Sequence, residues 1–232
     1  MTHPRSHGHH HDASADLVAA PTAVEGLWDE RYSADERVWS GEPNGALVAE
    51  AEVMVPGRVL DVGCGEGADA VWLALRGWDV TALDVSGVAL ERARQAAVDA
   101  GASVMWLHAG LLEADLPEGG FDLVSAQYPA LLRTSGNEAE KALLAAVAPD
   151  GTLLFVHHAQ FGSQHTEDDA GNPESANAHG FTPQDFVGPA DMAAMLGADW
   201  EVQTDELRAR DVQSGAGAHH TEDVVLKARR RA

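Results

Sequence analysis

Apolar and polar positions follow two different periods along this chain. Short runs of continuous apolar residues, rich in Val and Leu, alternate with longer stretches in which apolar residues recur every three or four positions. Runs of the first kind predict buried strands, and stretches of the second kind predict amphipathic helices. The predicted strands lie at residues 58–62, 78–85, 103–109, 121–127 and 151–158.

Predicted helices precede, separate and follow these strands, at residues 24–32, 45–54, 68–76, 87–100, 138–147 and 183–196. Asn44 and Ser86 stand immediately before two of the helices and are residue types that favour the N-cap position. In the helix that follows Ser86, Leu90 and Ala93 form the inward stripe, and Arg92 faces water.

Strands that alternate with helices are joined by right-handed crossovers, which produce a parallel sheet covered on both faces. Two further runs, 199–210 and 219–229, are predicted to pair as a hairpin. The predicted fold class is therefore doubly wound α/β: a Rossmann-like, mostly parallel seven-stranded sheet with a C-terminal antiparallel hairpin.

The predicted domain organisation is a single folded domain over residues 21–232. Residues 1–20 are rich in His, Ala and Asp without periodicity, so we predict a disordered tail and interpret its HGHHH stretch as a flexible leader. Residues 21–55 are expected to form an N-terminal helical cap. The polar residues 159–182 exceed an ordinary connection in length and form a possible lid loop.

The formal net charge of -22 disfavours nucleic acid as a partner, because a phosphate backbone requires a basic surface. The basic cluster of Lys227 and residues 229–231 is interpreted as a solvated tail. No stretch reaches the roughly 20 apolar residues of a membrane span and no secretory signal is visible, so we expect a cytoplasmic protein with a small-molecule partner. The single cysteine, Cys64, excludes an internal disulfide.

Residues 60–70, LDVGCGEGADA, carry the strongest candidate for a binding site. Gly63, Gly65 and Gly67 follow an apolar strand and precede a helix. Glycine lets the main chain approach a ligand closely, and the first turn of the helix directs N–H groups toward it. In a parallel sheet the ligand lies beyond the carboxyl ends of the strands. The loop therefore predicts a nucleotide-like ligand.

Two classes of ligand compete for this loop. The glycine pattern is compatible with a dinucleotide, and Asp84, at the end of the second strand, can accept both hydroxyls of a ribose in either class. Asp61 separates the classes, because its charge would repel a pyrophosphate and attract an ammonium or a sulfonium. Two unit charges about 4 Å apart near a protein surface interact by on the order of 4 kcal/mol. A cationic ligand is therefore favoured.

Residues 59–86, VLDVGCGEGADAVWLALRGWDVTALDVS, resemble the cofactor site of class I S-adenosylmethionine-dependent methyltransferases, especially the small tellurite-resistance and thiopurine-methyltransferase-like branch. The resemblance extends over about residues 24–158. It implies S-adenosyl-L-methionine as cofactor, with the glycines along its methionine part, Asp61 near that part and Asp84 on the ribose. The implied cofactor-binding residues of the loop and strand ends are Asp61, Gly63, Cys64, Gly65, Gly67, Asp84, Val85, Leu111, Leu112 and Gln127.

Aromatic residues near the N-terminus extend the resemblance. Trp28, Tyr32 and Trp39 have the spacing of the aromatic helix that folds over the cofactor in the thiopurine branch. Aromatic faces attract a sulfonium or an ammonium by roughly 0.5 to 2 kcal/mol each. Trp28 and Tyr32 also lie one helical turn apart, so plain core contacts are the alternative.

One position departs from the family's pattern. Members usually carry an acid after the third strand, on the adenine amino group, where this chain has Gly110. Either Glu113 or Asp115 replaces that acid, or backbone groups and apolar contacts near Leu111 and Leu112 hold the adenine.

Methyl transfer from a sulfonium needs no general acid, but a weakly acidic acceptor must lose a proton. The candidate bases are His157 and His158 at the end of the fifth strand, and Tyr128 after the fourth strand can position the acceptor. Strand alternation sends the two histidines to opposite faces, so at most one points at the ligand. His165 and His179, in the possible lid, are more simply polar loop residues.

The sequence thus predicts a methyltransferase that acts in line on a small molecule, through a sulfur, oxygen or nitrogen nucleophile or a chalcogen oxyanion. No catalytic metal is predicted, since the adjacent His219 and His220 are more simply exposed. The alternatives are an NAD(P)-dependent oxidoreductase of the same fold, although a Tyr-x-x-x-Lys pair is missing, and a non-enzymatic protein that binds the cofactor or a metal. The acceptor and the oligomeric state stay open.

Overall fold

The structure is a computed structural model that describes residues 21–159, 183–210, 212 and 214–232. The predictions for the tail at 1–20, for the lid loop beyond Ala159, and for His165 and His179 lie outside the described residues. Within them, no helix is both long enough and apolar enough to cross a membrane.

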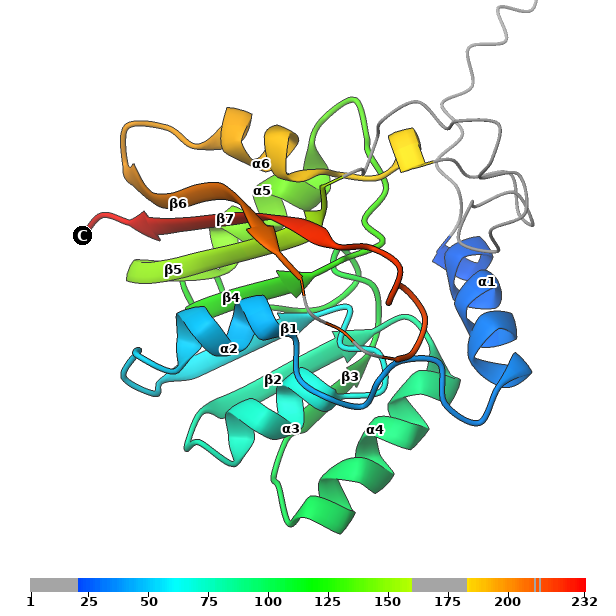
Figure 1. Ribbon diagram of the computed structural model, residues 1–232. Coiled ribbons are helices and arrows are strands. Elements are labelled where there is room, and N and C mark those ends of the chain that lie inside the picture. The colour runs from blue at the N-terminus through cyan, green and yellow to red at the C-terminus, as the bar shows by residue number, and fades with distance from the viewer. Residues whose placement is uncertain (1–20, 160–182, 211, 213) are drawn as a thin grey trace, which may run out of the picture.

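The strands are β1 (Arg58–Val62), β2 (Asp79–Asp84), β3 (Met105–His108), β4 (Phe121–Gln127), β5 (Val147–His158), β6 (Trp200–Ala209) and β7 (Glu222–Arg230). They form a seven-stranded sheet in the order β3-β2-β1-β4-β5-β7-β6 (Figure 1). β7 runs antiparallel to both β5 and β6, whereas the other neighbouring pairs are parallel. The predicted fold class is confirmed, including the C-terminal hairpin.

The helices are α1 (Pro21–Ala34), α2 (Gly45–Ala51), α3 (Ala68–Ala74), α4 (Gly87–Ala100), α5 (Glu138–Ala146) and α6 (Pro189–Met195), with a short 3-10 turn, η2, at Pro183–Asp185. α2 and α3 cover one face of the sheet, and α5 and α6 cover the other (Figure 1). α4 contacts α3, and α1 lies against α4.

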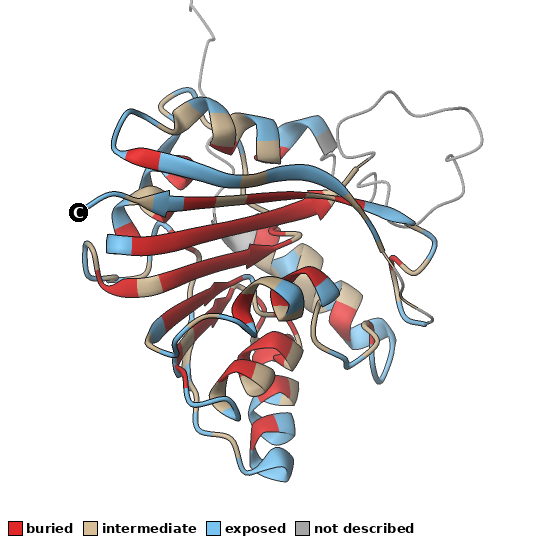
Figure 2. Ribbon diagram, turned by 60° about the vertical axis from the view of Figure 1, so that its left-hand side comes forward, coloured by how far each residue is buried: buried red, intermediate tan, exposed pale blue. Residues whose placement is uncertain are grey.

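Alternation of side chains along the strands divides the apolar residues between two cores. In β1, Leu60 belongs to the core that includes α5 and α6, whereas Val59 belongs to the core that includes α2 and α3. Strands buried on both faces read as continuous apolar runs, which is why the sequence pattern identifies them. Figure 2 shows the central strands buried along most of their length, while β6 at the edge is largely exposed.

Several element boundaries differ from the prediction by a few residues, and two of these differences have a visible cause. The helix expected at 183–196 is divided into η2 and α6, because Gly188 is extended and Pro189 starts a new helix. β5 begins at Val147 rather than at residue 151, because Val147 already pairs with Phe121 of β4.

The caps of α2 and α4 differ in kind. Ser86 caps α4 as predicted, and its hydroxyl accepts a hydrogen bond from the backbone N–H of Ala89 at 3.1 Å. Asn44 stands at the N-cap position of α2, but its side chain makes no cap and donates instead to Asp69 at 2.7 Å.

The basic residues near the C-terminus are not a solvated tail, so that interpretation was wrong. Lys227 lies inside β7, and its Nζ is 3.1 Å from a carboxylate oxygen of Glu50, with both side chains largely buried. Arg229 pairs with Asp150 at 2.5 Å. These side chains form ion pairs within the fold because β7 pairs with β5 as far as Arg229 and with β6 as far as Arg230.

Gly67→Ala tests how closely the start of α3 approaches α4. Gly67 has a φ of 82°, and a Cβ there would lie 2.7 Å from the Cβ of Ala93 and 2.9 Å from the ring of Trp106. We expect Gly67→Ala to lower the free energy of unfolding by about 1–3 kcal/mol more than Gly77→Ala does. Gly77 has a similar φ of 88° but no described atom within 4 Å of its Cβ position, so it isolates backbone strain. Chemical denaturation compares the two variants, and equal losses would contradict the close contact.

Candidate functional site

The loop between β1 and α3 crosses the carboxyl edge of the sheet, where β1 is flanked by β2 and β4. The backbone N–H groups of Gly63 and Cys64 donate to the carbonyl of Leu83 in β2, at 2.9 and 3.0 Å. Gly65 has a φ of 53°, and a Cβ on it would lie 2.8 Å from the hydroxyl of Tyr32. Glycine is therefore required here both for the turn and for a close approach of another group.

Three buried carboxylates surround this loop. Asp61 in β1 is 2% exposed, Asp69 in the first turn of α3 is 5% exposed, and Asp84 at the end of β2 is 7% exposed. Asp69 accepts hydrogen bonds from the backbone and side-chain amides of Asn44, both at 2.7 Å. Asp84 accepts from two backbone N–H groups, both at 2.8 Å. Asp61 Oδ2 has no hydrogen-bond partner among the described residues.

Burial raises the pKa of all three carboxyl groups above their usual values. The pKa of Asp61 is held well above its usual range, first by burial and then by the charges of Asp69 and Asp84. At Asp69 and Asp84 the accepted hydrogen bonds oppose the rise in pKa. A cation placed beside Asp61 would offset both the loss of hydration and the repulsion. The loop therefore has the electrostatics of a site for a positive charge.

The aromatic residues near the N-terminus meet over the loop. The ring centroid of Trp28 lies 5.9 Å from that of Tyr32 and 6.4 Å from that of Trp39. Trp39 Nε1 donates to the hydroxyl of Tyr32 at 2.8 Å, and that hydroxyl lies against Gly65. The guanidinium of Arg31 stands over the rings of Trp28 and Trp39, at 5.4 and 5.2 Å. The structure thus brings the three predicted aromatic residues to the glycine loop, while contact with a cofactor stays a prediction.

Glu66 and Arg92 fasten this aromatic segment to the loop. Glu66 accepts hydrogen bonds from the backbone N–H groups of Val38 and Trp39, at 3.2 and 3.0 Å, and pairs with Arg92 at 2.8 Å. Arg92 also donates to the carbonyl of Tyr32 at 2.6 Å. The expectation that Arg92 faces water was wrong, because its long side chain reaches from α4 back to Glu66.

The carboxylate of Glu113 lies where a Cβ on Gly110 would be, with Val85 beside the same position. Of the two acids that the sequence left open, Glu113 is therefore placed at Gly110. Leu111 is buried in the hydrophobic core, whereas Leu112 is 52% exposed. Their predicted contacts with adenine stay predictions.

Two further predicted residues lie close to the strand ends. The side-chain amide of Gln127 donates to Ser125 Oγ at 3.0 Å, and its Oε1 is buried without a partner among the described residues. Cys64 packs partly buried against the core that contains α2 and α3, and burial raises the pKa of its thiol. Cys64 is thus held as a neutral thiol within the loop.

Rings gather at the ends of β4 and β5. Tyr128, directly after β4, has a φ of 52°, which is unusual for a bulky side chain. Its ring stacks on His158 with centroids 4.3 Å apart and meets His157 edge-on at 6.1 Å. Strand alternation predicts that the two histidines diverge, but the backbone of Tyr128 turns so that its ring lies against both.

Asp223, Arg210 and His220 complete this cluster, and the sequence reasoning missed the first two. Asp223 in β7 accepts a hydrogen bond from the hydroxyl of Tyr128 at 2.7 Å, and its other oxygen lies 3.2 Å from His158 Nδ1. Arg210 Nε donates to the hydroxyl of Tyr128 at 3.2 Å. His220 stacks on His158 with centroids 3.8 Å apart, so the expectation of simple exposure was wrong for it. The predicted hairpin includes β7, but the position of Asp223 opposite His158 follows from the register between β7 and β5.

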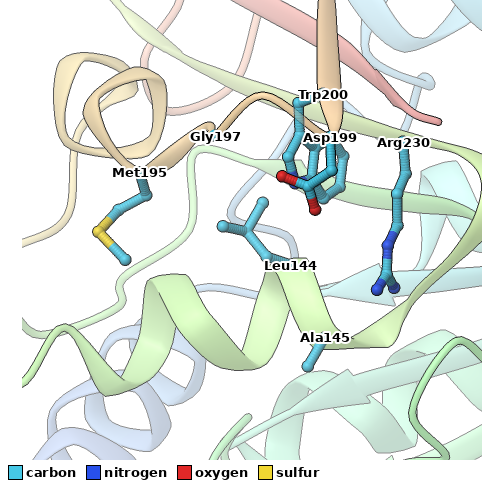
Figure 3. Close-up of a pocket in the computed structure, with 7 residues that line it drawn as sticks. All are labelled: Leu144, Ala145, Met195, Gly197, Asp199, Trp200 and Arg230. Atoms are coloured by element: carbon cyan, nitrogen blue, oxygen red, sulfur yellow. The ribbon is translucent and has the colours of Figure 1, made fainter.

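A hollow of about 270 Å³ lies between α5, α6, β6 and β7 (Figure 3). It is lined by Leu144, Ala145, Met195, Gly197, Asp199, Trp200 and Arg230. Because β6 begins and β7 ends there, the hollow lies at the amino-terminal edge of the parallel strands, opposite the glycine loop. It is therefore separate from the candidate site.

Comparison with known families identifies the central region. Residues 59–151 match the sequence model of a family described as "Methyltransferase domain", and the strand order is that of the class I methyltransferase fold. Residues 59–151 are a methyltransferase domain. This methyltransferase domain contains the glycine loop, all three buried carboxylates and Tyr128.

The methyltransferase domain also accounts for the similarity to curated proteins. The chain is 41% identical over 98 residues to an uncharacterized methyltransferase of Mycobacterium tuberculosis, a match that covers 42% of this chain and 49% of that protein. The chain thus spans about half the length of the curated relatives it matches.

Solved structures share the fold of the methyltransferase domain and its C-terminal strands. The structure titled "Conversion of a Disulfide Bond into a Thioacetal Group during Echinomycin Biosynthesis" is 23% identical with a TM-score of 0.69, covering 90% of this chain and 92% of that one. The 1,6-didemethyltoxoflavin-N1-methyltransferase of Burkholderia thailandensis is 17% identical with a TM-score of 0.60, covering 93% and 92% of the two chains. At these identities the likeness establishes the fold.

Glu66→Ala tests whether this carboxylate holds the aromatic segment on the loop. Hydrogen bonds to a charged group contribute about 1.5–3 kcal/mol each, so we expect amide exchange at Val38 and Trp39 to accelerate at least about 10-fold. Glu91→Ala is the matched control, because it removes the same type of side chain from a position on α4 where that side chain is 83% exposed. Hydrogen exchange by NMR makes the measurement. Unchanged exchange at both amides would show that Glu66 does not hold the segment.

Proposed function

We propose that this chain is an S-adenosylmethionine-dependent methyltransferase that acts on a small-molecule acceptor. The observation that carries the proposal is Asp61, a buried carboxylate beside the glycine loop with one oxygen unpaired among the described residues. The described charges that act on Asp61 are those of Asp69 and Asp84, both of the same sign as its own. S-adenosylmethionine, when bound, supplies a methyl group on a sulfonium and carries an ammonium nearby.

The residues at the loop fit this cofactor. We assign the methionine part to the backbone of Gly63, Gly65 and Gly67, and its ammonium to Asp61. Asp84 accepts hydrogen bonds from two backbone N–H groups, and a carboxylate retains further lone pairs for the hydroxyls of a ribose. Glu113 replaces the missing acid at Gly110 as the partner of the adenine amino group.

A dinucleotide fits the same loop less well. Its pyrophosphate would bring negative charge to a place where three carboxylates are already buried, and like charges about 4 Å apart repel by on the order of 4 kcal/mol near a surface. The aromatic rings of Trp28, Tyr32 and Trp39 favour the opposite sign, because their faces attract cations. Both features support a cationic cofactor over the oxidoreductase alternative.

The acceptor in this proposal is a small molecule. The net charge of -22 disfavours nucleic acid, and two of the similar structures have titles that concern small molecules, echinomycin biosynthesis and 1,6-didemethyltoxoflavin. We also propose that the chain belongs to the tellurite-resistance and thiopurine-methyltransferase-like branch. The positions of Trp28, Tyr32 and Trp39 support this assignment.

Calorimetric titration with S-adenosylmethionine and with NAD tests the function, together with Asp61→Asn. We expect saturable binding of S-adenosylmethionine and none of NAD. Loss of the buried charge in Asp61→Asn should weaken binding at least about 30-fold, or about 2 kcal/mol. Asp79→Asn is the control, because Asp79 is exposed at the opposite end of β2. Binding of NAD without binding of S-adenosylmethionine would support an oxidoreductase instead.

Mass spectrometry of thiols, phenols, amines and chalcogen oxyanions for the gain of one methyl group then identifies the acceptor.

Asp61→Asn should also stabilise the ligand-free protein, by about 1–3 kcal/mol near neutral pH, because an amide of the same shape removes a buried and repelled charge. Since the pKa of Asp61 is raised on folding, the folded wild type is favoured by protonation at low pH and loses that stability as the pH rises through the raised pKa. The stability advantage of Asp61→Asn should therefore grow with pH. Thermal unfolding across a pH series, with Asp79→Asn alongside, measures it. An advantage that shrinks as the pH rises would refute this account.

A further inference from the structure

The ring cluster at the ends of β4 and β5 lies next to the glycine loop. A Cβ placed on Gly63 would lie 3.9 Å from the Cα of Pro129, so the chain leaving β4 passes directly over the loop. Tyr128 precedes Pro129, and His158 stacks on the ring of Tyr128. The residue that follows Tyr128 is therefore in contact with the backbone to which the methionine part of the cofactor is assigned.

Hydrogen bonds distinguish the three groups that could take a proton there. The hydroxyl of Tyr128 donates to Asp223, and burial together with that carboxylate raises the pKa of the phenol above its usual value. Tyr128 thus stays protonated at neutral pH. In His157, Nδ1 accepts the backbone N–H of His158 at 3.0 Å, and burial lowers the pKa of its ring well below the usual value. The Nδ1 lone pair of His157 is therefore already used.

His158 has the arrangement of a base held by a carboxylate. Its Nδ1 lies 3.2 Å from an oxygen of Asp223, and a carboxylate accepts, so Nδ1 carries the hydrogen. That bond leaves the lone pair on Nε2 and fixes the orientation of the ring. Asp223 is 4% exposed, and its second oxygen is held by the hydroxyl of Tyr128. The carboxylate is thus anchored on both sides.

We propose that His158, positioned by Asp223, is the general base of the reaction, and that the acceptor is an uncharged molecule whose nucleophilic O–H, N–H or S–H group keeps its proton at neutral pH. The inference rests on the proposed methyltransferase function and deepens it. It adds Asp223 as a positioning residue, and it excludes the chalcogen oxyanion from the acceptors that the sequence leaves open.

The reaction couples a proton transfer to a displacement at the methyl carbon. Nε2 of His158 takes the proton from the acceptor while the acceptor atom forms its bond to the methyl carbon and the bond from that carbon to sulfur breaks, leaving the electron pair on sulfur. The imidazolium formed on His158 is stabilised by Asp223 through Nδ1–H. It returns to the neutral ring by releasing its proton to water.

The groups that face His158 set its charge at neutral pH. They come from the end of β4 (Tyr128), β5 (His157), β7 (Asp223) and the segment between β6 and β7 (Arg210 and His220). Burial lowers the pKa of His158 below its usual value, and Asp223 opposes that shift. His158 is therefore neutral at pH 7 and available as a base. An anionic acceptor has no need of this base and would meet the carboxylates around the glycine loop.

NMR of the protein labelled with ¹⁵N in histidine tests the arrangement without any acceptor. We expect the Nδ1–H tautomer for His158 at about pH 8, assigned by the loss of its signals in His158→Gln. Asp223→Asn should lower the pKa of His158 further, because the carboxylate that favours the charged ring is gone. Asp205→Asn is the control, since Asp205 is an exposed carboxylate on the neighbouring strand β6. An Nε2–H tautomer in the wild type would overturn the proposal.

Kinetics with two acceptor probes test the role in catalysis. Phenol, protonated at neutral pH, and a nitro-substituted thiophenol, already ionised there, are compared in wild type and His158→Gln. We expect a loss of about 10²- to 10⁴-fold for phenol and less than about 5-fold for the thiophenolate. In Asp223→Asn the acidic limb of the phenol profile should move to lower pH. Equal losses on both probes would overturn a role as base.

The two proposals fail in different ways. If the wild type binds no S-adenosylmethionine, the proposed function falls, whatever the tautomer of His158. If S-adenosylmethionine binds but His158 carries its hydrogen on Nε2, only the base assignment falls. If neither probe is methylated although the cofactor binds, the tautomer and the pKa shift in Asp223→Asn decide the arrangement.

Discussion

The burial of negative charge at one edge of the sheet is the constraint on which the rest of the site depends. Asp61, Asp69 and Asp84 come from β1, from the first turn of α3 and from the end of β2, so the fold itself draws them around the glycine loop. Asn44 and the backbone N–H groups at Asp84 compensate two of them. The charge of Asp61 is compensated least, because its Oδ2 has no hydrogen-bond partner among the described residues. A cationic ligand would compensate that charge.

Most of the fold could be predicted, because its strands are buried on both faces. The runs at 58–62 and 121–127 match β1 and β4 to the residue, since short, mostly apolar runs are typical of strands that are buried on both faces. The prediction failed where long-range pairing decided the outcome. β5 begins early because Val147 pairs with Phe121, and the basic residues of β7 became strand positions through pairing with β5.

The site could be predicted only for residues that are close to one another along the sequence. The glycine loop, Asp61 and Asp84 follow from local order along the β1–α3–β2 segment. Asp69 stands in the same segment, but its hydrogen bonds come from Asn44, 25 residues away. Asp223 lies opposite His158 because of the register between β5 and β7, which no local pattern encodes. Such contacts across the sheet required the structure.

The proton balance of cofactor binding tests the central claim most directly. Carboxylic acids whose pKa is raised by burial and by mutual repulsion must release protons when a cation binds beside them. Calorimetry of S-adenosylmethionine binding, in buffers of different ionisation enthalpy between about pH 5 and 7, counts those protons. We predict net proton release that increases as the pH falls. Binding with no proton release at any pH, or with proton uptake, would contradict it.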